Sequence, residues 1–273
     1  MRIPSPVVRR RAALWCLLAA PLTAAALEGG AGASDPQAGT PAAAVGSLYA
    51  AQRLLSGVLI DRQWVLTAAH AVNGAVPAEV VFRSPLAGGF VARARAVHVH
   101  PGFVTGQVDL ALVQLERPAP AALPPAPLYT GPLLGHIVHL VSHGGSTTLI
   151  TTGENRVDAL QPDAAGRPLL YLFDQDGPDL SSNVIGPAVP ANGTLGAGRE
   201  ATLAAGDSGS AAFVVLDGRW GLAGINTFQA TVTPKGGGPV GRLAGGIWLA
   251  PQAAWIARVL RGDKPDGGAD AKP

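Results

Sequence analysis

The stretch Ala205-Gly206-Asp207-Ser208-Gly209-Ser210 decides how the rest of the chain is interpreted. A serine stands between glycines directly after an acid, and an apolar run, Ala211-Ala212-Phe213-Val214-Val215, follows. Glycines permit a sharp turn and leave backbone N–H groups uncovered. Such a turn can expose a serine hydroxyl and direct N–H groups beside it, as nucleophilic acyl transfer requires. Alone, the stretch is equally typical of an ordinary turn before a strand, so an upstream histidine and acid must support it.

The composition favours short strands and turns. The chain has 273 residues, of which 48% are hydrophobic and 14% charged, with 36 glycines and 24 prolines. Few charges with many glycines and prolines suit strands and turns better than long helices. The length is enough for one large domain or two small ones with a real core.

Residues 1–26 are predicted to be a secretory signal peptide. Arg9-Arg10-Arg11 form a positive region, and the apolar run from Ala12 to Ala26 is too short to span a bilayer. Ala24-Ala25-Ala26 supplies the small residues that signal peptidase cuts after. A membrane anchor left uncut is the alternative.

Cleavage after Ala26 would change the charge and the redox chemistry of the chain. The removed piece carries four arginines and no acid, so the 20 basic residues fall to 16 against 18 acidic residues. The net charge then moves from +2 to −2, which gives no reason to expect a nucleic-acid partner. The single cysteine, Cys16, is also removed. We therefore expect a secreted or periplasmic monomer without disulfides and without stable membrane insertion.

The mature chain reads as a succession of short strands. Apolar segments such as Val45–Tyr49 and Trp64–Thr67 follow one another without a helical period, which predicts an antiparallel barrel or sandwich. Residues 117–132 are proline-rich and predict a linker. Pro251–Leu260 predicts a helix, because a proline begins it and apolar residues form a stripe. Residues 263–273 are predicted to be a disordered polar tail.

Two upstream segments supply the missing partners for the serine. Trp64-Val65-Leu66-Thr67-Ala68-Ala69-His70 places a histidine after a strand, and Val108-Asp109-Leu110-Ala111-Leu112 places an acid at the head of one. A carboxylate among valine and leucine is unfavourable unless it is hydrogen-bonded or paired. We therefore expect a buried, functional Asp109, with a strand-start acid facing water as the alternative.

These three segments resemble the histidine, aspartate and nucleophile motifs of the chymotrypsin-like serine proteases, in that family's chain order. His100-Pro101-Gly102-Phe103 and Trp255-Ile256 resemble further segments of the family, so the resemblance covers residues 45–261. It implies an all-β fold of two antiparallel six-stranded β-barrels with a C-terminal α-helix. Residues 45–124 would form the first barrel, and residues 125–262 the second barrel and the helix.

The resemblance also implies a role for each residue. Ser208 Oγ would attack the scissile carbonyl, His70 would accept and return the proton, and Asp109 would orient the imidazole. The N–H groups of Gly206 and Ser208 would form the oxyanion hole. The implied function is a secreted serine endopeptidase that forms an acyl-enzyme with protein or peptide substrates. A catalytically silent relative that binds proteins through the same cleft is the alternative.

The chain departs from the family pattern in its cysteines and in its substrate pocket. Ser56 and Ala71 stand where the family usually has a disulfide pair, which suggests a disulfide-free bacterial member. The position at the base of the primary pocket is Thr202, so a preference for arginine or lysine is not expected. Small or medium apolar residues are expected before the cut instead. The other pocket residues implied by the resemblance are Thr227, Phe228, Gln229 and Gly246.

Residues 27–44 can be interpreted in two ways. Leu27-Glu28-Gly29-Gly30 resembles the family's mature N-terminal motif, in which the terminal amine pairs with the acid before the serine, here Asp207. Signal peptidase itself would then expose Leu27. Alternatively, the segment is a flexible Gly/Ala/Pro-rich leader and Asp207 has another partner.

No cofactor is expected, although two groups of residues raise a metal alternative. Asp174, Asp176 and Asp179 are spaced along a glycine-containing turn and could hold Ca²⁺, but the full calcium-loop pattern is missing and an exposed acidic turn is favoured. His98 and His100 could bind a metal from one strand face, but no third ligand is evident and a strand-end role is favoured.

Overall fold

The computed structural model describes residues 26–29, 31–33, 41–176, 182–185, 193–196, 198–233 and 240–263. The predicted signal peptide up to residue 25 and the predicted tail from residue 264 onward lie outside the described residues. Within the described part, no helix has the length and apolar character needed to cross a membrane.

The described part of the chain contains fourteen strands. They are β1 (Ala31–Ala33), β2 (Val45–Ala50), β3 (Arg53–Asp61), β4 (Trp64–Thr67), β5 (Val81–Ser84), β6 (Phe90–Val99), β7 (Ala111–Leu115), β8 (Ile137–Ser142), β9 (Ile150–Arg156), β10 (Ala159–Pro162), β11 (Pro168–Asp174), β12 (Ala211–Leu216), β13 (Arg219–Val232) and β14 (Gly241–Trp248). The helices are α1 (Ala69–Val72) and α2 (Ala253–Leu260), with single 3₁₀ turns at η1 (Pro41–Ala44), η2 (Pro77–Glu79), η3 (Pro101–Phe103) and η4 (Ala250–Gln252).

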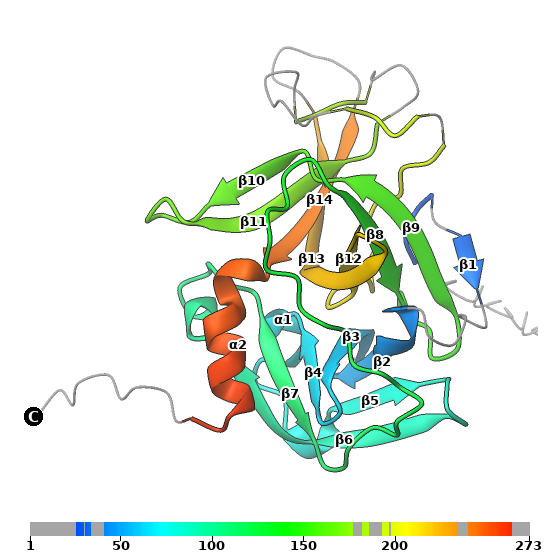
Figure 1. Ribbon diagram of the computed structural model, residues 1–273, viewed down its shortest axis with the longest axis vertical. Helices are drawn as coiled ribbons and strands as arrows, with labels where there is room; N and C mark the ends of the chain where they lie inside the picture. The colour runs from blue at the N-terminus through cyan, green and yellow to red at the C-terminus, as the bar shows by residue number, and fades with distance from the viewer. Residues whose placement is uncertain are drawn as a thin grey trace, which may run out of the picture.

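The first six strands after β1 form a closed antiparallel barrel in the order β2-β3-β4-β7-β6-β5 (Figure 1). Closure leaves no unpaired strand edge. In β6 the inward side chains of Phe90, Ala92 and Ala94 alternate with exposed residues, as the strand period requires. Gly46 makes room at the centre, because a Cβ on it would lie 2.4 Å from the ring of Phe82.

The second sheet has eight strands in the order β1-β9-β8-β12-β13-β14-β11-β10. The sheet curls so that β9 approaches β11, where Asn155 Nδ2 donates to the carbonyl of Asp174 (2.8 Å). The expected fold class is confirmed. Two short strands, β1 and β10, extend the six expected strands at the two ends of the sheet, and neither segment carries the branched or aromatic pattern that would have predicted a strand.

Helix α2 and the proline-rich linker connect the two barrels. The predicted helix is confirmed as α2, whose Trp255 ring packs edge-on against His100 at 4.7 Å, so the helix covers the first barrel (Figure 1). The proline-rich segment between β7 and β8 contacts both barrels in turn. The N–H of Ala126 donates to Leu59 (2.8 Å), and the N–H of Tyr129 donates to Leu222 (2.9 Å).

Candidate active site

The first barrel brings His70 and Asp109 together. β4 pairs with β7, with Thr67 opposite Ala111, so the residues that follow β4 lie beside those that precede β7. His70 Nδ1 lies 2.6 Å from Asp109 Oδ2, and the backbone N–H of His70 donates to Asp109 Oδ1 at 2.9 Å. An ionised carboxylate can only accept, so Nδ1 carries a proton, and in the neutral imidazole Nε2 is then the acceptor.

Asp109 is less buried than its apolar surroundings led us to expect. Its side chain is 25% exposed and that of His70 is 31% exposed, although Val108 and Leu110 on either side are buried. The acid lies in the segment just before β7 rather than within the strand. The carboxylate therefore stays at the rim of the barrel, where its two oxygens are directed at His70.

The turn that carries Ser208 is fastened to both barrels. Gly206 and Gly209 have positive φ angles of +102° and +82°. A Cβ on Gly209 would lie 2.1 Å from the carbonyl oxygen of Ser56, so this position needs glycine for conformation and for space. Ser56 N–H donates to the carbonyl of Ser208 (3.0 Å), and Gly209 N–H donates to the carbonyl of Asn226 (2.8 Å).

Ser208 is half-buried, between a half-buried Gly206 and a buried Gly209. Within the described residues, neither Gly206 nor Ser208 donates its N–H to a protein acceptor, and Ser208 Oγ makes no hydrogen bond to His70. Catalytic hydrogen bonds in enzymes without ligand are often long and tighten when substrate binds.

Asp207, between these two donors, is completely buried. Its Oδ2 accepts from the N–H groups of Leu27 (3.1 Å) and Ala204 (2.7 Å), and its Oδ1 accepts from Ser142 Oγ (2.5 Å). Burial raises the pKa of Asp207, and the hydrogen bonds from Ser142, Ala204 and Leu27 oppose that rise. The sequence indicated Asp207 and Leu27, but Ser142 had no recognisable signal because it ends an ordinary strand.

Residues 27–29 belong to the second barrel. Leu27 is 2% exposed, and Glu28 exchanges two backbone hydrogen bonds with Thr202 (3.0 and 2.9 Å). Glu28 also forms an ion pair with Arg242. Leu27 has a φ of +24°, which is strained for a residue with a side chain. Ala26 lies against Gly144, on which a Cβ would be 2.0 Å from the Cβ of Ala26.

A cavity of about 330 Å³ opens beside Ser208. It is lined by Leu203, Ala204, Ala205, Asp207, Ser208, Thr227, Phe228 and Gln229. Three of the expected pocket residues are in this set, whereas Thr202 and Gly246 are not. Thr202 is 1% exposed and pairs with Glu28, and Gly246 lies in β14, where a Cβ would be 1.9 Å from the carbonyl oxygen of Ile225.

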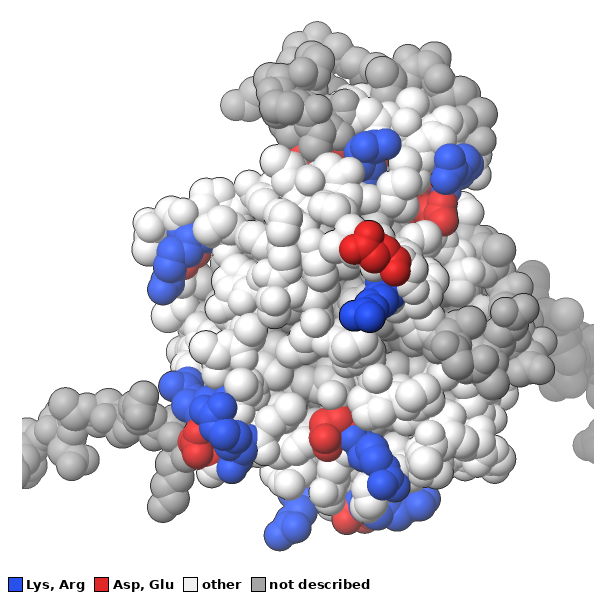
Figure 2. Space-filling view, viewed as in Figure 1, with Lys and Arg blue, Asp and Glu red and all other residues white. Residues whose placement is uncertain are grey.

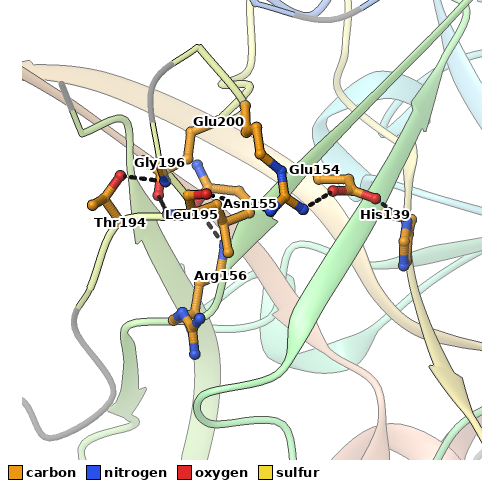
Figure 3. A network of polar contacts seen from close by, with 9 residues as sticks. His139, Glu154, Asn155, Arg156, Thr194, Leu195, Gly196 and Glu200 are labelled. Atoms are coloured by element: carbon orange, nitrogen blue, oxygen red, sulfur yellow. Dashed lines mark hydrogen bonds and ion pairs between the residues drawn. The ribbon is translucent and has the colours of Figure 1, made fainter. Parts of the chain in front are cut away.

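A polar network holds residues 199–201, which lead to this cavity, in place (Figure 3). Glu154 on β9 pairs with His139 (3.2 Å) and with Arg199 (2.9 Å). Next to it, the buried Asn155 Nδ2 donates to the carbonyl of Ala201 (2.9 Å). Glu200 Oε1 accepts from the N–H of Leu195 (2.8 Å). The sequence did not reveal this network, because polar residues in a strand are also typical of an exposed face.

The prediction of an exposed acidic turn is wrong for Asp174 and Asp176. Asp174 and Asp176 are buried, 1% and 7% exposed, beside the buried Asp158 and Glu200; Asp179 lies outside the described residues. Asp174 stays hydrogen-bonded because its Oδ2 accepts the N–H of Val184 (2.6 Å). Burial and then Asp174 raise the pKa of Asp158 to about 8, and the same two causes raise the pKa of Asp176 to about 7.

In the parts of the chain that the structure describes, no three His, Cys, Asp or Glu side chains are grouped as metal ligands. His100 Nδ1 accepts from the N–H of Gly102 (3.0 Å), and burial followed by Arg258 lowers the pKa of His100 to about 4. His98 packs against Trp64 at 5.4 Å. Both histidines therefore have packing or capping partners at the end of β6.

The closed first barrel carries a paired His and Asp, and the curled second sheet beside it carries a glycine-flanked Ser. This arrangement is typical of chymotrypsin-type serine peptidases. Residues 55–225, well over half of the chain, match the model of the trypsin-like peptidase domain. The chain belongs to this family of serine-type peptidases.

A weaker similarity links the chain to one named relative. A stretch of 76 residues is 41% identical to the complement C1s subcomponent of Sus scrofa. The match covers 23% of this chain and 11% of that protein. The chain thus spans a small part of the relative, and the shared stretch is a likeness of sequence rather than of the whole molecule.

Proposed function

We propose that the protein is a secreted serine endopeptidase in which His70, Asp109 and Ser208 form the catalytic triad. The observation that carries the proposal is the pair of hydrogen bonds from His70 to the two oxygens of Asp109, at 2.6 and 2.9 Å. They fix the ring and its tautomer, so that Nε2 is the free base. A family member retained only for binding has no need of a histidine held in this orientation and tautomer.

In the proposed reaction, Ser208 Oγ attacks the scissile carbonyl while His70 Nε2 removes its proton. Asp109 stabilises the imidazolium that forms, and the N–H groups of Gly206 and Ser208 bind the developing oxyanion. His70 then protonates the leaving amine, and water hydrolyses the acyl-enzyme by the reverse sequence.

We assign the 330 Å³ cavity beside Ser208 to the substrate residue before the cut. Leu203, Ala204, Ala205 and Phe228 contribute apolar groups, and Gln229 narrows the wall. Asp207 is the one carboxylate in the lining, and its oxygens already accept three hydrogen bonds from the protein. The cavity thus suits a small or medium apolar side chain better than arginine or lysine. A peptide library cleaved after Lys or Arg would contradict this assignment.

We further propose that signal peptidase, by cutting after Ala26, completes the site without a separate zymogen. The φ of Leu27 exists only while Ala26 is attached, so cleavage removes the strain at +24°. The freed amine would meet Asp207 Oδ2, which already accepts the Leu27 N–H. Mass spectrometry should find Leu27 at the N-terminus of the active protein. A fully active form that starts near Val45 would exclude this route.

The surface is consistent with protein or peptide substrates. Figure 2 shows a face on which charged side chains occur in small groups of mixed sign, separated by wide uncharged areas. Nucleic-acid binding would require a continuous basic surface, which this face lacks. We propose a disulfide-free bacterial monomer that acts in the periplasm or outside the cell, without a metal or other cofactor.

The proposal is tested by labelling the secreted protein with a fluorophosphonate probe. Wild type should be labelled, Ser208→Ala and His70→Ala should not, and Ser210→Ala should still be labelled because Ser210 lies two residues further on and accepts a hydrogen bond from Asn226 instead. Absence of labelling in folded wild type that begins at Leu27 would favour the silent binding module.

A further inference from the structure

A line of buried hydroxyl groups leads from the first barrel to the acid beside the nucleophile. Ser56 on β3 lies 3.2 Å from Ser142 at the end of β8, and Ser142 donates to Asp207 at 2.5 Å. All three side chains are completely buried. The line crosses from one barrel to the other at the place where the nucleophile turn lies against both.

The hydrogen-bond direction along this line is fixed by donor counting. A serine hydroxyl has one proton, and that of Ser142 is used on the carboxylate, which can only accept. Ser56 must therefore donate to Ser142, and Ser56 in turn accepts from the backbone N–H of His143 (3.1 Å). Ser142 also accepts from the N–H of Gly144 (3.0 Å). Every donor points toward Asp207, so each bond strengthens the next.

Ser56 is joined to the nucleophile through its backbone as well. Its N–H donates to the carbonyl of Ser208 (3.0 Å), and its own carbonyl accepts from Thr67 Oγ1 (2.8 Å), three residues before His70. Movement of Ser56 would therefore displace the serine turn relative to the strand that carries the histidine.

We propose that Ser142 and Ser56 form a positioning relay that holds Asp207, and with it the oxyanion-binding turn, in its working conformation. The proposal rests on the serine-peptidase function proposed above. Asp207 lies between Gly206 and Ser208, so rotation of its carboxylate out of the interior would turn both N–H groups away from their common point. Neither serine touches the substrate, so both act through Asp207.

The relay and the N-terminal segment hold different oxygens of the same carboxylate. Ser142 binds Oδ1, whereas Leu27 and Ala204 bind Oδ2. The relay does not depend on whether Leu27 carries a free amine. It therefore keeps one oxygen fixed in the uncut chain, and both supports act together after cleavage.

The test compares three buried serines that are each replaced by alanine. Ser142→Ala should lower kcat about ten- to a hundred-fold with KM nearly unchanged, the size expected when a hydrogen bond to a charged group is lost. Ser56→Ala should have a smaller effect, and the double variant should be no worse than Ser142→Ala. Ser47→Ala is the matched control, because Ser47 is equally buried and its hydroxyl has no hydrogen-bond partner among the residues that the structure describes. The kcat of this variant should not change.

A conservative variant separates positioning from folding. Ser142→Cys keeps the side-chain size and a weaker donor, so its kcat should lie between those of serine and alanine. An unchanged kcat in folded Ser142→Ala would overturn the relay, as would equal losses in Ser142→Ala and Ser47→Ala. If Ser142→Ala fails to fold, the cysteine variant decides, and wild-type kcat there also overturns the proposal.

A second measurement needs no catalysis, so it separates failure of the relay from failure of the proposed function. The ¹³C shift of the Asp207 carboxyl reports its pKa, which should rise in Ser142→Ala and stay unchanged in Ser47→Ala. Glu28 and, after the proposed cleavage, the Leu27 amine are the charged groups that face Asp207, and both are present in all variants. If the fluorophosphonate probe does not label wild type but the pKa of Asp207 rises in Ser142→Ala, the proposed peptidase function is wrong and the relay is retained. An unchanged pKa would remove the relay.

Discussion

The two barrels differ in what they bury. Between residues 41 and 115 the buried polar side chains are all hydroxyls, namely Ser47, Ser56, Thr67 and Ser84. The second barrel buries two asparagines, Asn155 and Asn226, together with five carboxylates, namely Asp158, Asp174, Asp176, Glu200 and Asp207. The first barrel is thus a nearly apolar scaffold, whereas the second is held together by polar groups that need partners.

This difference follows from what each barrel presents. His70 and Asp109 lie at the rim of the first barrel, and adjacent strands position them directly. The second barrel must hold long segments against one another around the cavity, and backbone groups in such segments need partners. Buried carboxylates accept from the N–H groups of these segments, as Asp174 does for Val184, and buried amides donate to their carbonyl groups, as Asn155 does for Ala201. The second barrel should therefore be more sensitive to pH, and the first to loss of volume.

The largest effect is expected from Asp109→Asn in the first barrel. An amide can donate to Nδ1 and so favour the wrong imidazole tautomer, and kcat should fall about 10⁴-fold, the loss known for the catalytic triad of this family. Stability should hardly change, because the carboxylate is 25% exposed. Steady-state kinetics and thermal unfolding of the same sample check both statements. A loss of less than tenfold would mean that Asp109 does not set the tautomer.

The next largest effect is expected from the loss of apolar packing in the first barrel. Phe82→Ala empties the space beside Gly46 at the barrel centre and should lower the free energy of unfolding by about 3–5 kcal/mol. The loss should be the same at pH 6.5 and pH 8, because no titratable group is involved. Val91→Ala, an exposed position in β6, is the control and should change stability by less than about 0.5 kcal/mol. A pH-dependent loss in Phe82→Ala would contradict the comparison of the two barrels.

In the second barrel we expect the melting temperature to fall as the pH rises from 6.5 to 8. Asp158 and Asp176 have folded-state pKa values of about 8 and about 7, above the ordinary value of 3.8. Their protonated forms stabilise the fold at low pH, and this stability is lost as the pH rises through the folded-state values. His100 and His143, whose pKa values burial lowers to about 4, act in the opposite direction but only below pH 6.5.

The variant Asp158→Asn isolates this effect. It removes one ionisation from the group while keeping the side-chain shape, so it should raise the melting temperature at pH 8 and flatten the slope between pH 6.5 and 8. Calorimetry at four or five pH values is sufficient. If the slope is as steep in the variant as in wild type, Asp158 is not the group that titrates.

Sequence patterns could predict the fold because strand periods and motif order are local features. His70, Asp109 and Ser208 were found through short motifs, and α2 through its proline start and apolar stripe. Ser142 and Asn155 escaped prediction because their partners lie far along the chain: Asp207 is 65 residues from Ser142, and Ala201 is 46 residues from Asn155. The burial of Asp174 was missed because the backbone donors that make it tolerable, Val184 and Ile185, lie 10 and 11 residues further on, beyond the acidic turn itself.

The smallest effect should come from Glu154→Gln in the network of Figure 3. The Glu154 side chain is 34% exposed and Arg199 is 56% exposed, so solvent screens their ion pair. We expect a loss of less than about 1 kcal/mol by chemical denaturation, and the loss should decrease further in high salt. The segment before the cavity should stay in place, because the buried Asn155 still binds the Ala201 carbonyl. A loss of several kcal/mol would show that exposed ion pairs of the second barrel, and not only its buried polar side chains, hold residues 199–201 in place.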